Sequence, residues 1–215
     1  MQFNVLSIDI DWCQSHFHIE QLNKVFYKQS ASAKKIVFSQ HHHQIVPEII
    51  DKDNIVLHNI DHHHDIQYDD WHISDIEQGK STHGCWVGNM MWFNKIKEYV
   101  WYNNMNSHTE YTEYVDLLFK NKVVPFSIER HLDGVNDINT YDLLFVCLSP
   151  EYSANAGMNQ GHQGALLYQC YLDACKTLYN SKTTETRLVS DMRNTPIYIT
   201  AIPEGSGWMT TQWRK

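Results

Sequence analysis

The chain has 215 residues, of which 42% are hydrophobic and 20% charged, so it is too apolar for a disordered protein and typical of a globular one. Because 17 basic residues stand against 25 acidic ones, the net charge is −8, which argues against general nucleic-acid binding. The length fits one α/β domain, and we expect a single domain over residues 1–215.

Short apolar runs recur along the chain and predict strands that are covered on both faces. In chain order they are Gln2–Asp9, Lys34–Gln40, Asn54–Asp61, Glu98–Asn104, Lys122–Glu129, Tyr141–Ser149 and Pro196–Pro203. Helical patterns lie between them, at His16–Lys28, Cys85–Lys97, Thr112–Lys120 and Gly164–Tyr179. The alternation predicts a three-layer α/β/α domain with a mostly parallel sheet. The polar stretch Ser181–Arg193 predicts a mobile connection.

The sequence also indicates the cellular compartment of the protein. It has no apolar run of about 18 residues, so we expect no transmembrane helix and no membrane partner. Its first residues lack the basic and apolar regions of a signal peptide. The five cysteines are odd in number and form no C-x-x-C pair, which favours reduced thiols. We therefore expect a cytoplasmic protein.

Histidines and aspartates cluster where three of the predicted strands end. Of the 14 histidines, eight lie within residues 41–72. The sequence D-I-D occupies residues 9–11, H-H-H residues 41–43 and D-H-H-H-D residues 61–65. In open parallel sheets, ligands bind outside the carboxyl ends of the strands, so the three clusters should share one site.

The third cluster carries the strongest metal signal. Alternate residues place Asp61, His63 and Asp65 on one side of the chain, and this mixture of ligands suits Mn²⁺, Fe²⁺, Zn²⁺ or Ni²⁺ but not Ca²⁺. Burying the carboxylates without a cation would be costly. Taken alone, the D-I-D pair could instead cap a turn, and the histidine triplet could be a polar surface run. Together, four aspartates and two histidines would furnish a two-metal site.

These motifs resemble those of the arginase/agmatinase (ureohydrolase) family. The segment at 61–65 resembles its D-A-H-x-D motif, S-I-D-I-D at 7–11 its S-x-D-x-D motif, S-Q-H-H-H the histidine of its G-G-D-H motif, and T-H-G at 82–84 its L-H-G segment. The segments HHHQIVPEI, IDHHHDI, GNMMWFNKI and YDLLFVCLSPEY are similar to a compact branch, the UPF0489-type proteins, which includes peptide arginases. The resemblance covers mainly residues 3–152. In ordinary arginases the S-x-D-x-D strand comes second, whereas here it comes first.

The resemblance implies two Mn²⁺ ions held by six residues, Asp9, Asp11, His42, Asp61, His63 and Asp65. Asp9 and Asp61 would bridge the ions. His42 and Asp65 would complete one ion and His63 and Asp11 the other, with His41 as the alternative to His42. If the backbone stays extended, His62 and His64 would point away from the ions.

The resemblance also implies catalytic and substrate-binding residues. His83 would give a proton to the leaving group, although it could equally be a surface histidine. Where the family has its guanidinium-binding glutamate, this chain has Cys147, and Glu151 or Glu129 could take that role.

Further contacts with the substrate are expected from Asp70 and Asn89. The first lies in Gln67–Ile76, which we expect to be a loop at the rim of the site. The nearby aromatic residues Trp86 and Trp101 could line a peptide-binding wall, but core packing is the favoured interpretation.

The predicted reaction is hydrolysis of an arginine side chain in a peptide to ornithine and urea. Water shared by two cations loses its proton near neutral pH, and the hydroxide would attack the guanidinium carbon. An arginine-containing peptide is the expected partner. The alternatives are a metal-dependent amidohydrolase or deacetylase, a non-catalytic metal-binding protein, and a histidine-rich nickel or zinc store.

Overall fold

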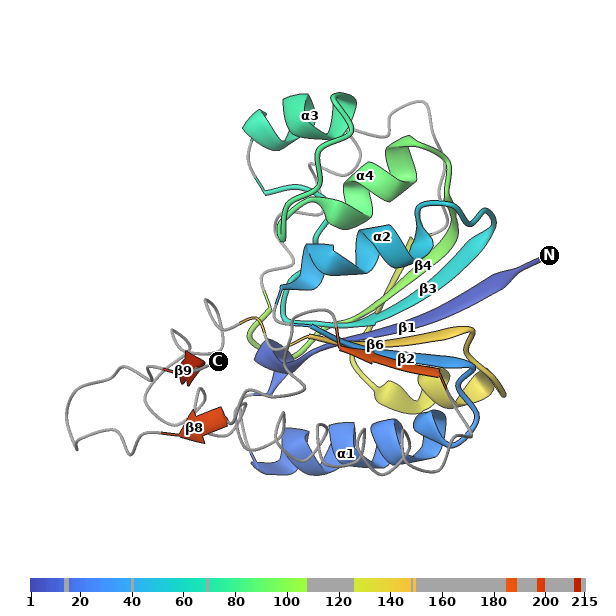
Figure 1. The fold of residues 1–215 in the computed structure, drawn as a ribbon, viewed down its shortest axis with the longest axis vertical. Coiled ribbons are helices and arrows are strands. Elements are labelled where there is room, and N and C mark those ends of the chain that lie inside the picture. The colour runs from blue at the N-terminus through green and yellow to red at the C-terminus, as the bar shows by residue number, and fades with distance from the viewer. Residues whose placement is uncertain are drawn as a thin grey trace.

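A parallel sheet forms the centre of the protein (Figure 1). The computed structural model describes residues 1–13, 16–39, 41–68, 70–107, 126–147 and 149, and the strand segments 185–188, 197–199 and 211–213. The sheet contains β1 (Phe3–Asp9), β2 (Lys35–Ser39), β3 (Ile55–Ile60), β4 (Ile96–Tyr102), β5 (Phe126–Glu129), β6 (Leu143–Cys147) and β7 (Glu185–Leu188). The strand order is β5-β4-β3-β1-β6-β2-β7, and every neighbouring pair is parallel. Separately, β8 (Ile197–Ile199) pairs antiparallel with β9 (Thr211–Trp213).

Helices cover both faces of this sheet. The α-helices are α1 (His16–Ser30), α2 (Val46–Ile49), α3 (Asp70–Glu77) and α4 (Trp86–Trp92), and the 3-10 helices are η1 (Ile10–Trp12), η2 (His42–Ile45) and η3 (Leu132–Asp137). Figure 1 shows α1 below the sheet and α2 and α4 above it, with α3 beyond α4. The predicted three-layer α/β/α architecture is therefore confirmed.

The alternation of side chains along each strand explains the two layers. Successive residues of a strand point to opposite faces, so Leu6 of β1 packs with Phe26 of α1, while Val5 joins the core that includes Trp86 and Met90 of α4. All six residues of β3 are buried, as expected for a central parallel strand. The apolar runs in the sequence are thus the strands whose side chains form the core on both faces of the sheet.

The departures from the expected elements have local causes. The predicted helix Cys85–Lys97 is too long, because Asn94 adopts a left-handed conformation (φ 56°) that ends α4 and lets β4 begin at Ile96. The expected rim loop is also wrong for most of its length, since α3 occupies Asp70–Glu77. Strand β7 was hidden in a polar stretch because an edge strand needs fewer apolar side chains. The predicted helices Thr112–Lys120 and Gly164–Tyr179 lie outside the described residues.

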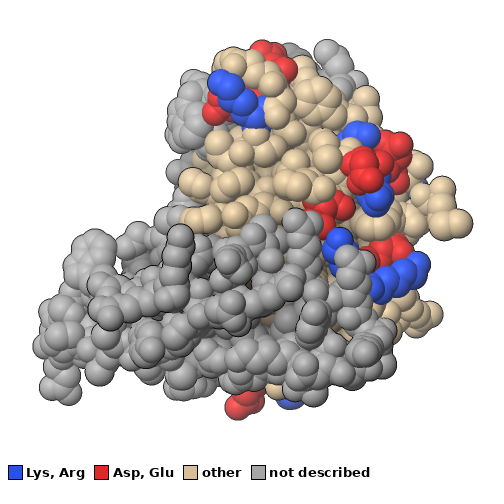
Figure 2. Space-filling model, in the orientation of Figure 1, with Lys and Arg blue, Asp and Glu red and all other residues tan. Residues whose placement is uncertain are grey.

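The two ends of the strands differ in character. Near the amino ends, lysines pair with acidic residues, as in Lys34–Asp142 (2.6 Å) and Lys95–Asp53 (2.8 Å), and charged side chains gather on this side in Figure 2. At the carboxyl ends, the connection after β1 leaves toward the face covered by α1, and those after β2 and β3 leave toward the other face. The carboxyl ends of strands at such a change of direction are where α/β proteins bind ligands. Among the described residues, no helix is long and apolar enough to cross a bilayer.

Candidate metal centre

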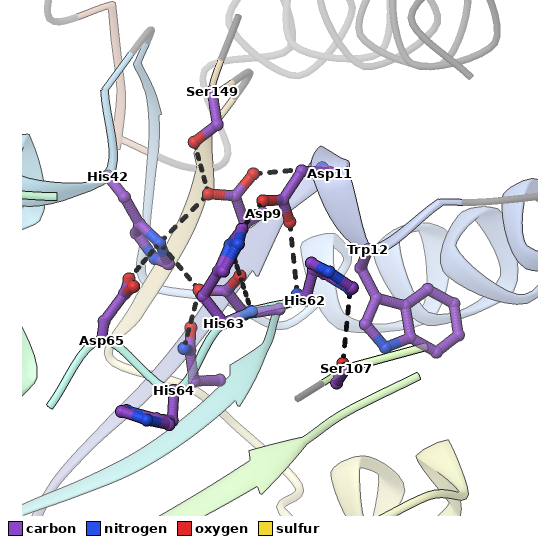
Figure 3. Close-up of polar contacts among 12 residues, drawn as sticks. Asp9, Asp11, Trp12, His42, His62, His63, His64, Asp65, Ser107 and Ser149 are labelled. Atoms are coloured by element: carbon purple, nitrogen blue, oxygen red, sulfur yellow. Dashed lines mark hydrogen bonds and ion pairs between the residues drawn. The ribbon is translucent and has the colours of Figure 1, made fainter. Parts of the chain in front are cut away.

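The carboxyl ends of three strands bring the predicted ligands together, although β6 lies between β1 and β2 in the sheet. Asp61 directly follows β3. Asp9 is the last residue of β1, and His42 begins η2, three residues after β2 ends at Ser39 (Figure 3). All three are at least 97% buried. Their carboxylate and imidazole atoms lie within 4.8 Å of one another, and we call Asp9, His42 and Asp61 the first triad.

In the first triad, Nδ1 of His42 faces three carboxylates. It lies 3.2 Å from Oδ2 of Asp9, 3.1 Å from Oδ2 of Asp61 and 2.9 Å from Oδ2 of Asp65. The site is therefore surrounded by more negative charge than one imidazole can balance.

A second triad consists of Asp11, Asp61 and His63. Nδ1 of His63 lies 2.9 Å from Oδ2 of Asp11 and 3.8 Å from Oδ1 of Asp61. Asp61 thus turns one oxygen toward each triad. The family resemblance implied bridging by both Asp9 and Asp61, and the structure places Asp61 in both triads and Asp9 in the first.

The unsatisfied atoms of the cluster fit a cation. Within the described residues, Nδ1 of His42 and Oδ2 of Asp11 are buried and make no hydrogen bond, although each lies close to ligand atoms of opposite character. Buried polar atoms normally have hydrogen-bond partners. Around a shared cation, carboxylate oxygens and imidazole nitrogens approach one another in this way without bonding to each other. This ligand set suits Mn²⁺, Fe²⁺ or Zn²⁺.

The electrostatics of the cluster point the same way. Burial and the neighbouring carboxylates of Asp65 and Asp9 raise the pKa of Asp61 to about 7. Burial also raises the pKa of Asp11, with Asp61 adding to the effect. Burial alone would lower the pKa of His63, but Asp11 and Asp61 outweigh it and raise that pKa to about 10. The raised pKa values favour protonated side chains in the cluster, and a bound cation would replace these protons.

Hydrogen bonds from neighbouring residues orient the ligands, and sequence reasoning missed most of these residues. Ser7 Oγ lies 2.6 Å from Nε2 of His42, so the other ring nitrogen is left facing the carboxylates. The Ser149 hydroxyl donates to Oδ2 of Asp9, and Asn59 Nδ2 donates to Oδ2 of Asp61 at 3.1 Å. Such supporting bonds fix the orientation of metal ligands. Ser7 belongs to the S-I-D-I-D motif, which was the only signal for it in the sequence.

Helix α4 holds Asp65 in an uncommon backbone conformation. The φ angle of Asp65 is 52°, so the chain after β3 does not stay extended. The indole Nε1 of Trp86 donates to Oδ2 of Asp65 at 2.6 Å, and the backbone N–H groups of Val87 and Gly88 donate to its carbonyl oxygen at 3.0 and 3.3 Å. Gly88 is required here, because a Cβ atom would lie 2.1 Å from the carbonyl oxygen of Ile66.

The two remaining histidines of D-H-H-H-D lie on different sides of the cluster. His64 is buried, its Nδ1 accepts from the backbone N–H of Ile66, and its ring stacks on Tyr68 with centroids 4.3 Å apart. His62 is half-buried, and its Nδ1 lies 3.3 Å from Oδ1 of Asn104.

The predicted catalytic and substrate-binding residues are less closely tied to the cluster. His83 is exposed, three residues before α4. Asn89 is buried in α4 and donates to the carbonyl oxygens of Ile76 and Lys80, so its amide holds the end of α3. Glu129 is exposed at the end of β5. The side chain of Asp70 and all of Glu151 lie outside the described residues, and the roles of these residues stay predictions.

Comparisons with known proteins do not assign the chain to a family. No family model matches the chain, and neither curated proteins nor solved structures give a significant match. A function is therefore argued from the two triads and the residues around them.

Proposed function

We propose that this protein is a two-metal hydrolase that converts arginine side chains of a peptide into ornithine, with release of urea. The observation that carries the proposal is the pair of buried triads that share Asp61 at the carboxyl edge of a parallel sheet. The arginase-like motifs in the sequence supply the reaction class.

The ligands for the two cations follow from the triads. Asp9, His42 and Asp61 would hold the first cation with help from Asp65, and Asp11, Asp61 and His63 would hold the second. Bound in this way, two cations supply a water that is deprotonated near neutral pH and a positive charge next to the reacting carbon. The protein itself must bind the guanidinium group, orient it and provide the proton for the leaving amine.

The burial of the two triads indicates how a substrate enters. The side chain of His42 is 1% exposed, whereas that of His63 is 27% exposed. A substrate would therefore approach over the second triad. Because the four carboxylates of the cluster are assigned to the two cations, a cationic guanidinium needs a further carboxylate, which binds it best through two parallel hydrogen bonds. Glu129 and Glu151 remain our candidates for that carboxylate.

The alternative functions make different demands on the site. A single-metal amidohydrolase or deacetylase needs one set of ligands, and the second triad exceeds that need. A nickel or zinc store would need many weak sites, whereas the two triads form one compact cluster in which all residues except His63 are buried. A non-catalytic protein would bind two ions and turn over no substrate.

The test combines metal analysis with a mass assay. The protein, loaded with Mn²⁺, is incubated with arginine-containing peptides, and each converted arginine should lose one CH₂N₂ unit as water is consumed and urea released. The variant Asp61→Asn should be inactive, and Asp75→Asn, which alters a surface partner of Lys80, should retain activity. Two bound ions without any mass change would refute the arginine substrate, and a lack of stoichiometric metal would refute the two-metal site.

A further inference from the structure

The loop after β4 contacts both chain segments that carry the second triad. The key residue in this loop is Asn104, which is 4% exposed. Its Nδ2 donates to the backbone carbonyl of Trp12 at 3.1 Å, and its Oδ1 lies 3.3 Å from Nδ1 of His62. One amide side chain thus connects η1, the loop after β3 and the loop after β4.

These contacts are made with the residues next to two ligands. Trp12 follows Asp11 in the chain, and His62 precedes His63. The backbone N–H of His62 donates to Oδ1 of Asp11 at 3.2 Å, which leaves Oδ2 of the same carboxylate 2.9 Å from Nδ1 of His63. Figure 3 shows His62 between His63 and Ser107, with Trp12 alongside. The distance between Asp11 and His63 therefore depends on segments that Asn104 holds together.

The orientation of the Asn104 side chain is itself fixed. Its Oδ1 accepts from the backbone N–H of Asn106 at 2.9 Å and from the hydroxyl of Ser107 at 3.3 Å. The carbonyl oxygen therefore faces its own loop and His62, and the NH₂ group faces Trp12. An amide offers an acceptor and a donor on one short side chain, which neither alanine nor aspartate can do.

The first triad is supported by other residues. Ser7 contacts His42, Ser149 donates to Asp9, and Trp86 donates to Asp65. Each of these contacts comes from β1, from the segment after β6 or from α4, and none from the loop that contains Asn104. The two triads share Asp61, and the backbone N–H of Asp11 also donates to Oδ1 of Asp9 at 3.1 Å, but the contacts from Ser7, Ser149 and Trp86 are separate from those of Asn104.

We propose that Asn104 is a positioning residue for the second cation alone. This inference rests on the proposed two-metal site and goes beyond it, because it assigns the two cations to separate structural supports. Removing the amide should loosen η1 against the loop after β3, let Asp11 move away from His63 and weaken one cation position while the other is retained.

The test is a Mn²⁺ titration of the full chain and of three variants, with bound metal measured by elemental analysis. In Asn104→Ala, the second cation should bind about 10- to 100-fold more weakly, the typical effect of removing a supporting contact, while the affinity for the first stays within about 2-fold. Ser7→Ala should show the reverse pattern. Asn104→Asp, which keeps the shape and the acceptor but loses the donor to Trp12, should resemble Asn104→Ala and gives a second measurement if the alanine variant does not fold.

A spectroscopic signal separates positioning from general damage. Electron paramagnetic resonance of the Mn²⁺-loaded protein should show a magnetically coupled pair in the wild type and isolated Mn²⁺ in Asn104→Ala. Equal weakening of both cations, or an unchanged coupled pair, would overturn the inference. If the wild type binds no stoichiometric metal, both the proposed function and the role of Asn104 are refuted. If the wild type and Asn104→Ala both bind two ions equally well, only the role of Asn104 is refuted.

Discussion

Oδ2 of Asp61 lies 3.1 Å from Nδ1 of His42, while the other oxygen of the same carboxylate is directed at the second triad. One side chain therefore belongs to both candidate cation positions. Asp61→Asn should remove both ions, because a neutral amide neither bridges two cations nor balances their charge. Asp11→Asn should remove only one. Elemental analysis of each variant measures this, and an Asp61→Asn protein that keeps two ions would contradict the shared ligand.

The indole of Trp86 donates a 2.6 Å hydrogen bond to Asp65. In Trp86→Phe the carboxylate loses this donor, and we expect the affinity of the first cation position to fall about 10-fold or more, measured by Mn²⁺ titration. Met90→Ala is the matched control, since it removes volume from the same helix and the same core without touching Asp65. It should lower the free energy of unfolding by about 2–5 kcal/mol and leave metal affinity unchanged.

Gly88 allows α4 to approach the backbone after Asp65. In Gly88→Ala the new Cβ atom would meet the carbonyl oxygen of Ile66, a backbone atom that cannot rotate away. We expect a loss of about 1–3 kcal/mol or more in stability and weaker binding of the first cation, seen in chemical denaturation and metal titration. In Gly134→Ala the close atom is the hydroxyl of Tyr102, the end of a side chain, so the loss should be smaller. Equal losses would argue against the backbone clash.

Removing metal should destabilise the protein. The three aspartates Asp9, Asp61 and Asp65 lie around one buried imidazole, and a cation relieves their mutual repulsion. A chelator should lower the melting temperature, and free Mn²⁺ at about 100 times its Kd should add about 2.7 kcal/mol. Since the pKa of Asp61 is raised to about 7, protons compete with the cation, and its affinity should fall as the pH drops below that value. A Kd that does not change across pH 7 would contradict this competition.

His58, which is not one of the proposed metal ligands, should make the free energy of unfolding depend on pH. Burial lowers its pKa from 6.5 to about 4, and its Nδ1 lies 2.8 Å from the hydroxyl of Tyr102. Because the unfolded chain binds this proton more readily, the folded state should lose up to about 3 kcal/mol as the pH falls from 6.5 to 4. His58→Gln should remove that part of the slope in urea denaturation at several pH values. A variant with the same slope as the wild type would show that His58 is not its source.

Much of the candidate site could be predicted from the sequence because its ligands follow apolar strands directly. Asp9 and Asp61 were identified in this way, since the ends of parallel strands meet at one edge of the sheet. The choice among the three adjacent histidines could not be made with the same certainty. In the structure, η2 starts at His42 and turns that residue inward, while the rings of His41 and His43 stack on each other 5.9 Å apart.

The supporting residues could not be predicted, because they become neighbours only through the tertiary structure. Ser149 lies 140 positions from Asp9, and Trp86 lies 21 positions from Asp65. Helix α3 was missed for a different reason: its sequence is mostly polar and only Ile76 is fully buried among the residues whose side chains are described there, so its apolar periodicity is weak.

The parallel pairing of β1 with β3 has a consequence for how such a centre could form. Parallel neighbours need a crossover connection, and along the chain α1, β2 and α2 separate Asp9 from Asp61 although their two strands are paired. The linear segment D-H-H-H-D contributes to both triads but completes neither, because Asp9, Asp11 and His42 come from other strands' ends. A cation would therefore be bound by the complete sheet, and the order of the strands, more than any local motif, would determine whether the protein can hold it.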